Sequence, residues 1–480
     1  MRKVSKQVFL SAITCPTLGW SVRSGQIVDT PTSADRLRME QGIEIGLRAR
    51  QLYPEGILVG EPDVASAVEK TRSLMNDPNV SAIFEGTFSE DGYSTKGDIL
   101  RRTAGGWYLV EVKASANDKD EFIDDMAYTT MVILRSGTHV SGVSILLVSK
   151  DYRLGMENDK LFVEIDHTQD VMERVEEFKP LWEQIDESTS RAQKPPAELR
   201  FDCRKCETFM ECLGQDVENH VFEIPRLSPS KFEKLKELGI VSIEDIPDDF
   251  ELTDNQKRVS DSVRSNAPFV GDDLENELQV ISKPCYYLDF ESMMTAIPLY
   301  EDVAPLAQIP TQYSIHRCES PGKIVAHSEY IAAPHKDCRR ELAERLIQDL
   351  ADEGDIVVYT HFEKRMINGL ISEYPDLRND LQALASRLVD LAAIIRGNYY
   401  HPGFHGSTSI KNTLPVLVPG MSYDALEIAD GDSASAEFAF CALGKYDDQK
   451  VELIKEQLLT YCKQDTLAMV KLHERLLALV

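Results

Sequence analysis

Two stretches of this chain share one pattern, in which short apolar segments of strand length alternate with amphipathic helical segments. The first spans residues 79–149 and the second spans 283–480, and a charged stretch separates them. At 480 residues, of which 42% are hydrophobic, the chain is too long for one ordinary core and apolar enough to build more than one. We therefore expect an α/β protein with domains at 1–215 and 281–480, joined by a helical connector at 216–280.

The first pattern begins with a helical segment and continues into a strand meander. Helix-forming residues fill 36–54, and residues 79–113 read VSAIFEGTF, GYSTKGDILRR and GGWYLVEVKAS, three apolar runs broken by turn residues. A second helical segment is expected at 124–137, a strand at 140–149, and one charged amphipathic helix at 173–189. This order of elements favours an α/β core.

The second pattern contains four strand-like runs, PCYYLDFES, TQYSIHR, IVAHSEYIA and DIVVYTH, and closes with two helices, the last being QLLTYCKQDTLAMVKLHERLLALV. In the connector, KLKELGIVSIEDI (residues 234–246) resembles a helix–hairpin–helix element, and a plain helical linker is the alternative. The sequence thus predicts a second complete α/β domain.

Composition limits the environment and the partners. We find no apolar run of eighteen residues and no leader pattern at the amino terminus, which favours a cytoplasmic protein without membrane contact. In that compartment clustered cysteines are metal ligands rather than disulfides. The formal net charge of -28 argues against broad adhesion to nucleic acid, so any such binding must be local. The same acidity also serves solubility.

Three residues of the meander suit phosphodiester hydrolysis. Asp98 opens a strand, and Glu111 and Lys113 lie two apart on the next strand, so both project from one face. We expect Val110 and Val112 to fill the core on the opposite face. Two carboxylates can hold Mg²⁺ while a lysine orients water or neutralises developing charge. A solvated Asp and an outward Glu-x-Lys pair are the alternative.

This segment resembles the PD-(D/E)xK nucleases of the RecB-like type, particularly the CRISPR-associated iron–sulfur nucleases and the AddB nuclease domain, over most of residues 1–215. The resemblance implies that Asp98, Glu111 and Lys113 are catalytic and that the two acids bind metal. Many relatives carry a metal-binding His on the first helix, where this chain offers Glu44 as the ligand candidate. Their Gln and Tyr on the helix after the lysine are replaced, and Thr129 and Val132 occupy those places.

Four cysteines form a second motif. Cys203, Cys206 and Cys212 follow the spacing Cys-x2-Cys-x5-Cys, and Cys15 stands in TCPTLGW almost two hundred residues earlier. Four thiolates can close one metal site. The same arrangement in the iron–sulfur RecB-like nucleases implies a [4Fe-4S] cluster, and a structural zinc site is the alternative. The other cysteines lack ligand spacing and are expected to be buried small side chains.

Acidic residues of the second pattern form the third motif. Asp289 and Glu291 lie two apart on YYLDFES and project from one face, while Leu288 and Phe290 project from the other. Glu363 follows the strand DIVVYTH. The final helix places Tyr461 and Asp465 one turn apart on one helix face. Four converging acids make a two-metal site.

The third motif resembles the DEDD exonucleases of the RNase H-like (DnaQ-like) fold, in the branch with Tyr-x3-Asp, over residues 283–480. The resemblance implies that Asp289, Glu291, Glu363 and Asp465 hold two Mg²⁺ or Mn²⁺ ions and that Tyr461 orients the attacking water. Glu363 stands where that family has Asp. Taken singly, an Asp-x-Glu pair or a Tyr-x3-Asp pair is often only a surface feature.

The whole chain resembles a bacterial family in which an iron–sulfur RecB-like module precedes a DEDD-like domain, with LDFE, QYSIH and the GS-SIK-LP stretch in common. This implies a metal-dependent nuclease with 3'-5' exonuclease action in DNA repair or in defence against foreign DNA, with DNA favoured over RNA as partner. Two alternatives remain open: a nucleic-acid-binding scaffold with decayed nuclease sites, and an iron–sulfur redox-regulated protein.

Overall fold

The structure is a computed structural model that describes residues 3–27 and 30–480, and it is a mixed α/β protein. The chain divides into two compact units. The first holds residues 1–198 together with Thr295–Ala307, and the second holds Leu199–Met294 and Gln308–Val480. Within the described ranges no helix has the length and apolar character needed to cross a membrane.

The first unit is built on a six-stranded sheet with the order β1-β2-β3-β4-β5-β6. Strands β1 and β2 are parallel, as are β4 and β5, and the other neighbours are antiparallel. Its elements in chain order are α1 (Lys6–Thr14), α2 (Pro16–Ser24), α3 (Ser33–Arg50), β1 (Ile57–Leu58), α4 (Val64–Asn76), β2 (Ala82–Glu90), β3 (Tyr93–Thr103), β4 (Gly106–Lys113), α5 (Asp120–Arg135), β5 (Val140–Val148), the short 3-10 helix η1 (Asn158–Leu161), β6 (Phe162–Asp166), α6 (Thr168–Phe178) and α7 (Leu181–Ser190).

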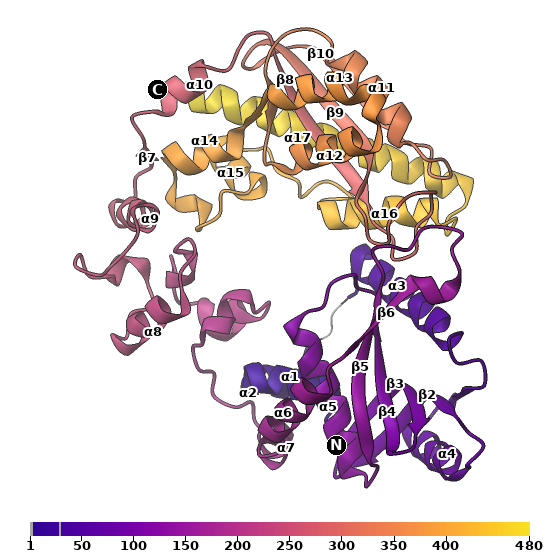
Figure 1. The fold of residues 1–480 in the computed structure, drawn as a ribbon. Coiled ribbons are helices and arrows are strands. Elements are labelled where there is room, and N and C mark those ends of the chain that lie inside the picture. The colour runs from indigo at the N-terminus through magenta and orange to yellow at the C-terminus, as the bar shows by residue number, and fades with distance from the viewer. Residues whose placement is uncertain (1–2, 28–29) are drawn as a thin grey trace. The chain divides into compact units, whose positions relative to one another are not determined.

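Both faces of this sheet are covered. Helices α1, α5, α6 and α7 gather on one face, where Phe9, Tyr128 and Phe178 form the centre of the core (Figure 1). Helix α3 packs on the other face through Ala49, which meets Phe84 in a smaller apolar cluster. The predicted meander and its flanking helices are confirmed by β2, β3, β4, α3 and α5.

One local prediction is wrong. The charged helix expected at 173–189 is two helices, α6 and α7, separated at Lys179 and Pro180. Proline has no N–H to donate and its ring clashes with the preceding turn, so a helix that runs into it ends or kinks. The amphipathic pattern continues across the break because Phe178 and Trp182 both face the core.

The second unit begins with short helical turns and helices and then forms a five-stranded sheet with the order β10-β9-β8-β11-β12. Its elements are η2 (Phe201–Lys205), η3 (Met210–Gly214), η4 (Val221–Glu223), α8 (Pro229–Glu237), η5 (Ile243–Asp245), α9 (Asp254–Ser265), β7 (Phe269–Val270), α10 (Leu274–Gln279), β8 (Cys285–Met293), β9 (Ile309–Ser320), β10 (Lys323–Ile331), α11 (Arg339–Asp349), β11 (Ile356–Val358), α12 (Phe362–Glu373), η6 (Pro375–Leu377), α13 (Arg378–Ser386), β12 (Leu388–Asp390), α14 (Leu391–Asn398), β13 (Tyr399–Tyr400), η7 (Pro402–Phe404), α15 (Ile410–Leu417), α16 (Gly431–Ala442) and α17 (Asp448–Leu477).

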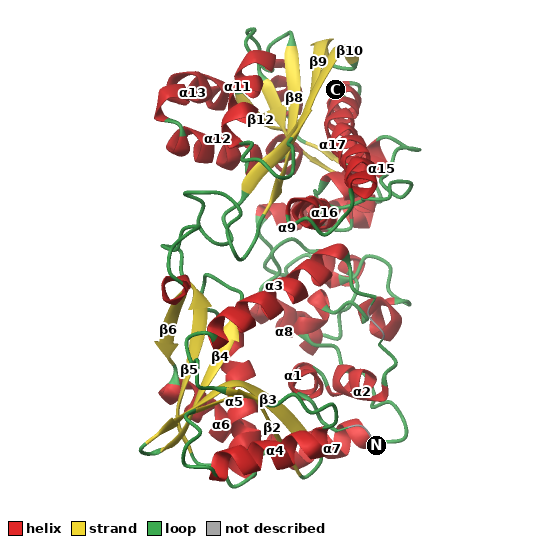
Figure 2. Ribbon diagram, turned by 90° about the vertical axis from the view of Figure 1, so that its right-hand side faces the viewer, coloured by secondary structure: helices red, strands yellow, loops and turns green. Residues whose placement is uncertain are grey.

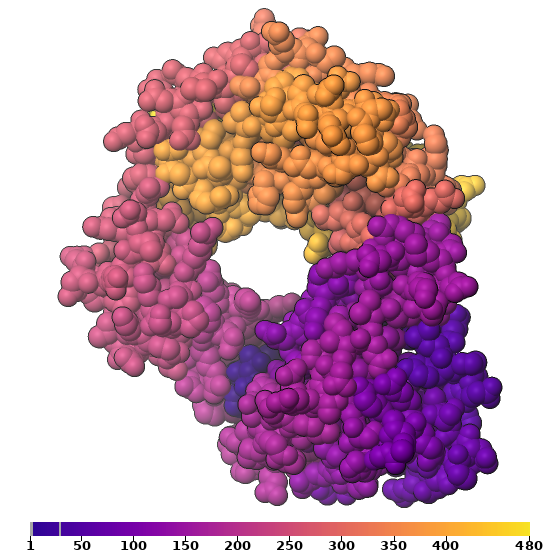
Figure 3. All heavy atoms as spheres, viewed as in Figure 1, coloured from indigo at the N-terminus to yellow at the C-terminus, as the bar shows by residue number. Residues whose placement is uncertain are grey.

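Strands β8, β9 and β10 form an antiparallel meander, and β11 and β12 run parallel to β8. Figure 2 shows α11, α12 and α13 on one side of this sheet and the long helix α17 on the other. Atoms coloured orange, from the middle of this unit's sequence, form part of its surface in the space-filling view (Figure 3). The central strand β8 is therefore enclosed on both faces, which positions its polar residues inside the unit.

The segment where the connector was expected contains α8, α9 and α10 and belongs to the second unit. After α8 the chain turns at Gly239, whose φ of 72° lies in the left-handed region that glycine adopts without strain. The element after this turn is η5, a 3-10 helix of three residues. The Gly turn of the helix–hairpin–helix resemblance is thus present, followed by a single 3-10 turn.

Between β8 and β9 the chain enters the first unit for thirteen residues, Thr295–Ala307. Ala296 is buried there in a cluster with Ile45, Val148 and Tyr152. Its backbone N–H donates a 2.9 Å hydrogen bond to Oε1 of Gln41 on α3. Nothing in the sequence pattern of this segment predicted that packing.

The hydroxyl of Tyr128 is expected to stabilise the first unit. This fully buried group donates hydrogen bonds to the carbonyl oxygens of Val4 at 2.6 Å and Ser94 at 3.0 Å. In Tyr128→Phe both oxygens lose a buried donor, so the free energy of unfolding should fall by about 1–3 kcal/mol. In Tyr108→Phe the lost bond goes to Asp166 in an exposed place, and the change should stay below about 0.5 kcal/mol.

Tryptophan fluorescence during urea unfolding measures this effect selectively. All three tryptophans, Trp20, Trp107 and Trp182, lie in the first unit, so their signal reports on that unit alone. Equal destabilisation by the two Tyr→Phe changes would contradict the role given to Tyr128.

Candidate functional site

The acidic residues predicted on the second sheet lie on its central strand. Asp289 and Glu291 alternate along β8 with Leu288 and Phe290, and the latter two are buried on the opposite face. β8 is hydrogen-bonded to β9 on one side and to β11 on the other, so its backbone is held on both edges. The strand therefore presents two half-buried carboxylates in a fixed orientation, as the sequence predicted.

The remaining predicted residues of this motif come from two helices. Glu363 lies in the first turn of α12, just after β11, and only 3% of its surface is exposed. Tyr461 and Asp465 lie one turn apart on the buried face of α17. Helix α17 packs against β8 and β9, which places Asp465 over the face of β8 that carries the two acids.

The acids converge. Ligand oxygens of Asp289, Glu291 and Asp465 all lie within 4.8 Å of one another, a spacing at which they could hold one metal ion. Glu363 and Tyr461 line the same pocket, which has a volume of about 530 Å³. The walls also include the apolar or small residues Met294, Ile410, Phe362, Gly431 and Met469 and the acids Asp430 and Asp432.

Burial and mutual repulsion disfavour the ionised forms of these acids. Burial raises the pKa of Asp465 to about 6, and burial together with Asp390 and Asp465 raises that of Glu363 to about 8. Burial, followed by the neighbouring carboxylates, raises the pKa of Asp289 and of Glu291 well above the ordinary range. One buried oxygen, Oε2 of Glu363, has no hydrogen-bond partner within the described residues. Protons or a divalent cation that prefers oxygen ligands could neutralise such a set.

Three further residues lie beside this cluster, and the predicted acidic motif included none of them. Tyr423, on the segment between α15 and α16, donates a 2.5 Å hydrogen bond to Oδ1 of Asp465. The thiol of Cys462 lies 3.3 Å from Oδ2 of Asp289, and Lys411 lowers the pKa of Glu291 and Asp465. Cys462 was expected to be a buried small side chain, which it is. No spacing rule links Tyr423 to an acid 42 residues later, so the sequence gave no signal for it.

The first unit also brings its predicted trio together. Asp98 on β3 and Glu111 and Lys113 on β4 project from one face, and the N–H of Val112 donates a 2.8 Å hydrogen bond to Oδ2 of Asp98. Oε1 of Glu111 accepts hydrogen bonds from Lys113 at 3.3 Å and from Lys6 at 2.9 Å. Its Oε2 atom is buried and, in the described part of the chain, has no hydrogen-bond partner.

The pKa values of the two acids in this trio are shifted in opposite directions. Burial, and then the charge of Glu111, raises the pKa of Asp98 to about 7. Burial also disfavours the charge of Glu111, but the ammonium groups of Lys6 and Lys113 outweigh it and lower the pKa of that carboxyl. Lys113 itself, although burial opposes its charge, has a raised pKa because it faces Glu111 and Asp125. The site therefore contains two ammonium groups that donate hydrogen bonds directly to one of its acids.

One expectation about this strand needs correction. Val110 is buried as predicted, but Glu111 does not point outward, since only 4% of its surface is exposed. Its face of β4 also carries Leu109, which packs in the core beneath α5. Both sheet faces are covered, so the alternation of apolar and charged residues does not separate core from solvent here.

The ligand candidate Glu44 lies apart from the trio. It is exposed on α3 and forms a 2.9 Å ion pair with Arg48, one turn further along the helix. The carboxylate that acts on Asp98 besides Glu111 is Glu85, a non-glycine residue at φ 55° on β2. Its neighbours Phe84 and Gly86 pair with Ile99 and Gly97, so Glu85 lies opposite Asp98.

Helix α5 carries the replaced positions. Thr129 and Val132 are both fully buried. The hydroxyl of Thr129 donates to the carbonyl oxygen of Asp125 at 3.1 Å and accepts from Thr95 at 3.3 Å. Thr129 therefore belongs to the packing between α5 and β3. The contribution of α5 to the trio is Asp125, 2.5 Å from Nζ of Lys113, which was not predicted.

The four predicted cysteine ligands are all half-buried. Cys15, in the first unit, directly follows α1 and caps α2. In the second unit Cys203 lies in η2, Cys206 caps that turn, and Cys212 lies in η3. The N–H of Arg200 points at Sγ of Cys203 at 3.4 Å, the kind of N–H···S contact found around metal-bound thiolates.

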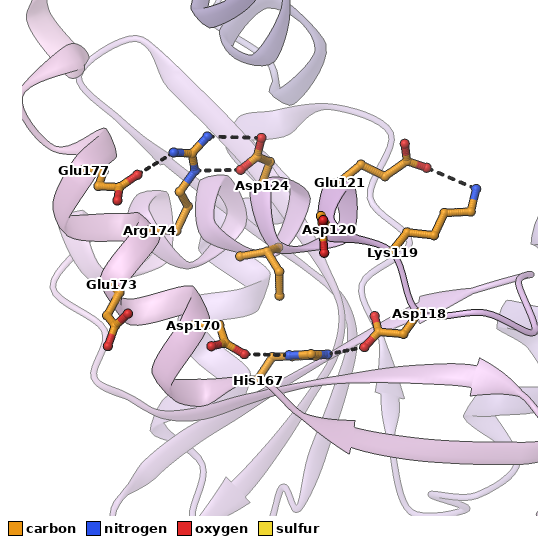
Figure 4. Close-up of a pocket in the computed structure, with 11 residues that line it drawn as sticks. Asp118, Lys119, Asp120, Glu121, Asp124, His167, Asp170, Glu173, Arg174 and Glu177 are labelled. Carbon is orange, nitrogen blue, oxygen red and sulfur yellow. Dashed lines mark hydrogen bonds and ion pairs between the residues drawn. The ribbon is translucent and has the colours of Figure 1, made fainter.

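A third acidic pocket lies beside α5 and α6 (Figure 4). His167 stands between Asp118 and Asp170, with ring nitrogens 2.9 and 3.0 Å from their carboxylates. Burial opposes the charged imidazole, but the two carboxylates raise the pKa of His167. On the opposite wall Arg174 pairs with Asp124. His167 and Arg174 are thus paired with carboxylates of the same pocket, so we interpret it as an ion-paired surface.

Comparisons with known proteins find one family model and a curated relative. A family model described as a domain of unknown function (DUF2779) matches residues 286–409, which include Asp289, Glu291 and Glu363. The chain is also similar to the "Uncharacterized protein MG366 homolog" of Mycoplasma pneumoniae (strain ATCC 29342 / M129 / Subtype 1), at 26% identity over 224 residues. That match covers 42% of this chain and 34% of the relative, so the chain spans about a third of the curated relative's length. Neither description names an activity.

The acidic cluster on β8 and α17 should make the stability of the second unit depend on pH and on metal. Folding raises the pKa of Asp465 to about 6 and of Glu363 to about 8, so the folded state binds their protons more tightly than the unfolded chain does. The resulting stability is present below about pH 4 and is lost as the pH rises towards 8. Without metal, the melting temperature of the unit should be several degrees lower at pH 8 than at pH 5.5. Each kcal/mol of lost unfolding free energy lowers it by about 2–4 °C.

Calorimetry with EDTA or with Mn²⁺ tests this dependence. Calorimetry detects the unfolding of both units, and tryptophan fluorescence detects only that of the first, so the transition without a fluorescence change belongs to the second unit. Mn²⁺ should raise this transition more at pH 8 than at pH 5.5. Asp465→Asn should stabilise the metal-free unit and abolish the Mn²⁺ effect. A metal-free transition that rises with pH over this range would show that the acids are not held as described.

Proposed function

We propose that this protein is a metal-dependent nuclease that hydrolyses phosphodiester bonds. The observation that carries the proposal is the convergence of Asp289, Glu291 and Asp465 within 4.8 Å, with Glu363 buried in the same pocket. Phosphoryl transfer with two divalent ions needs such a set, because the ions hold the scissile phosphate and activate water. The pocket of about 530 Å³ is open to a terminal nucleotide and has apolar walls for its base.

The order of the strands supports a DEDD-type exonuclease domain of the RNase H-like fold. An antiparallel meander, β8 to β10, is extended by β11 and β12 parallel to β8, and the acids come from the first strand, the helix after β11 and the last helix. This arrangement fits 3'-5' exonuclease action, in which Tyr461 orients the attacking water. Glu363, one methylene longer than Asp, reaches the pocket from the first turn of α12.

The first unit supports a second nuclease site of the RecB-like PD-(D/E)xK type. Asp98 and the unpartnered Oε2 of Glu111 would hold Mg²⁺ or Mn²⁺, and Lys113, fixed by Asp125, would orient water or neutralise the developing charge. DNA is the favoured substrate over RNA, in repair or in defence against foreign DNA within the cytoplasm. With a net charge of -28, contact with nucleic acid must be local to these sites.

A nucleic-acid-binding scaffold is the second candidate function, and the observation that favours it lies in the first unit. Glu44 is ion-paired on the surface and Thr129 and Val132 are packed in the core, so the positions that usually assist a RecB-like site do not assist here. On this alternative the first unit would bind nucleic acid without cutting it.

Nuclease assays on end-labelled single-stranded DNA, duplex DNA and RNA separate these candidates. Asp289→Asn should lower the rate of one product pattern by at least about a hundredfold, and Lys113→Ala should do the same for another. Asp376→Asn and Lys160→Ala are the matched controls, because both side chains form exposed ion pairs. Binding without cleavage by the wild type would favour the scaffold, and unchanged products in Asp289→Asn would rule out the β8 site.

The cofactor proposed for the cysteines is a [4Fe-4S] cluster, with zinc as the alternative. The proposal rests on the spacing of Cys15, Cys203, Cys206 and Cys212 in the sequence and on the affinity of thiolates for either metal; all four are half-buried. The metal would mainly be structural. A redox-regulated protein is the further alternative, for which the cluster would have to be labile.

Metal analysis of anaerobically purified protein decides between the two metals. We expect about four iron atoms per chain and a broad absorbance near 400 nm that Cys206→Ser abolishes. Cys338→Ser, at a cysteine buried elsewhere in the second unit, should leave both unchanged. One zinc and no iron would identify a zinc site, and a loss of nuclease activity in air together with iron would support redox control.

A further inference from the structure

Two tyrosines face the carboxylate of Asp465, and they come from different parts of the chain. Tyr461 lies one turn before Asp465 on α17, whereas Tyr423 lies on the segment between α15 and α16. Their ring centroids are 6.1 Å apart and the rings are tilted by 58°. Both side chains are buried, with 5% and 6% of their surface exposed. A site that needs one tyrosine for the attacking water therefore contains a second.

The hydroxyl of Tyr423 is committed to Asp465. It donates to Oδ1 at 2.5 Å, a short hydrogen bond of the kind that forms between a neutral O–H and a carboxylate. A carboxylate held at one oxygen loses its freedom to rotate about the bond to Cβ and keeps its second oxygen available. That is the requirement for a ligand that must meet Asp289 and Glu291 within 4.8 Å.

The segment that carries Tyr423 is fixed to α17 at adjacent positions. Nε2 of Gln464 donates a 3.3 Å hydrogen bond to the carbonyl oxygen of Ser422, next to the Tyr423–Asp465 bond. Nζ of Lys411 lies 5.9 Å from the centre of the Tyr423 ring, on the side of α15. The ring is thus enclosed by α15 and α17, and its hydroxyl has a defined direction.

We propose that Tyr423 is a positioning residue of the β8 metal site, whose hydroxyl holds Asp465 as a ligand and leaves Tyr461 to the attacking water. This inference rests on the proposed function of that site. On this inference, Tyr423 and Tyr461 have different roles although both face Asp465. Removing the Tyr423 hydroxyl should weaken metal binding, and removing the Tyr461 hydroxyl should slow the chemical step.

Mn²⁺ titration followed by electron paramagnetic resonance measures metal binding without reference to cleavage. The full chain is used with Asp98→Asn in every variant, so that the first unit does not contribute bound metal. Tyr423→Phe should raise the Kd for Mn²⁺ about tenfold, the usual effect of losing a group that orients a metal ligand. Tyr461→Phe should raise Kd clearly less than Tyr423→Phe does, because Tyr461 makes the weaker of the two hydrogen bonds to Asp465. Tyr313→Phe is the matched control, since its hydroxyl donates to the carboxylate of Asp349 outside the pocket.

Cleavage of single-stranded DNA gives the second readout. In Tyr423→Phe the rate should recover at saturating Mn²⁺, whereas in Tyr461→Phe kcat should stay about 10²–10⁴-fold low at every Mn²⁺ concentration, as for a lost proton-transfer or water-orienting group. The thermal transition of the second unit confirms that each variant is folded.

Each outcome decides something. Binding of Mn²⁺ by Tyr423→Phe as tight as in Tyr313→Phe overturns the inference, and so does an equal loss of affinity in Tyr461→Phe, because the roles would not be divided. If the wild type binds Mn²⁺ but cuts no nucleic acid, the proposed function fails while the Kd values still judge Tyr423. If the wild type binds no Mn²⁺ at this site, both fail.

Discussion

The second unit must accommodate the repulsion among carboxylates that are held close together in its interior. Asp289 and Glu291 are held on a strand that is paired on both edges, and Asp465 is fixed to α17, so the acids cannot move apart. A protein can keep such charges close only if protons or cations neutralise them, and the free energy then appears as raised pKa values. The surrounding fold must therefore supply from its core the stability that this repulsion removes.

The first unit solves the same problem differently. Lys6 and Lys113 both lie against Oε1 of Glu111, so this carboxylate is ionised with resident cations. Lys6 is the first residue of α1, where the helix dipole disfavours a positive charge, and the ion pair with Glu111 offsets that cost. A metal bound there would join an environment with positive charge already present, whereas on β8 it would supply most of the positive charge itself.

Local patterns in the sequence predicted the strands and helices that hold the candidate site residues. They could not predict contacts between residues far apart in the sequence. The alternation in YYLDFES and the helical spacing of Tyr461 and Asp465 predicted which side chains share a face, and the structure confirms both faces. The same alternation misled at Glu111, because a strand covered on both sides has no solvent face. Lys6, Asp125 and Tyr423 reach their partners through tertiary packing over 105, 12 and 42 residues, and no periodicity reports such contacts. The division into two units likewise depends on contacts that only the folded chain reveals.

The excursion of Thr295–Ala307 has a topological consequence. Because this segment lies in the first unit while β8 and β9 on either side lie in the second, the backbone passes from one unit to the other three times. A single cut after Glu198 would release a first unit that lacks Ala296 and uncovers Ile45. It would also leave the segment Thr295–Ala307 without the packing that anchors it. The two units are therefore not independent consecutive domains. Exchanging either one alone for a related unit would interrupt the connection between β8 and β9, and β8 carries Asp289 and Glu291.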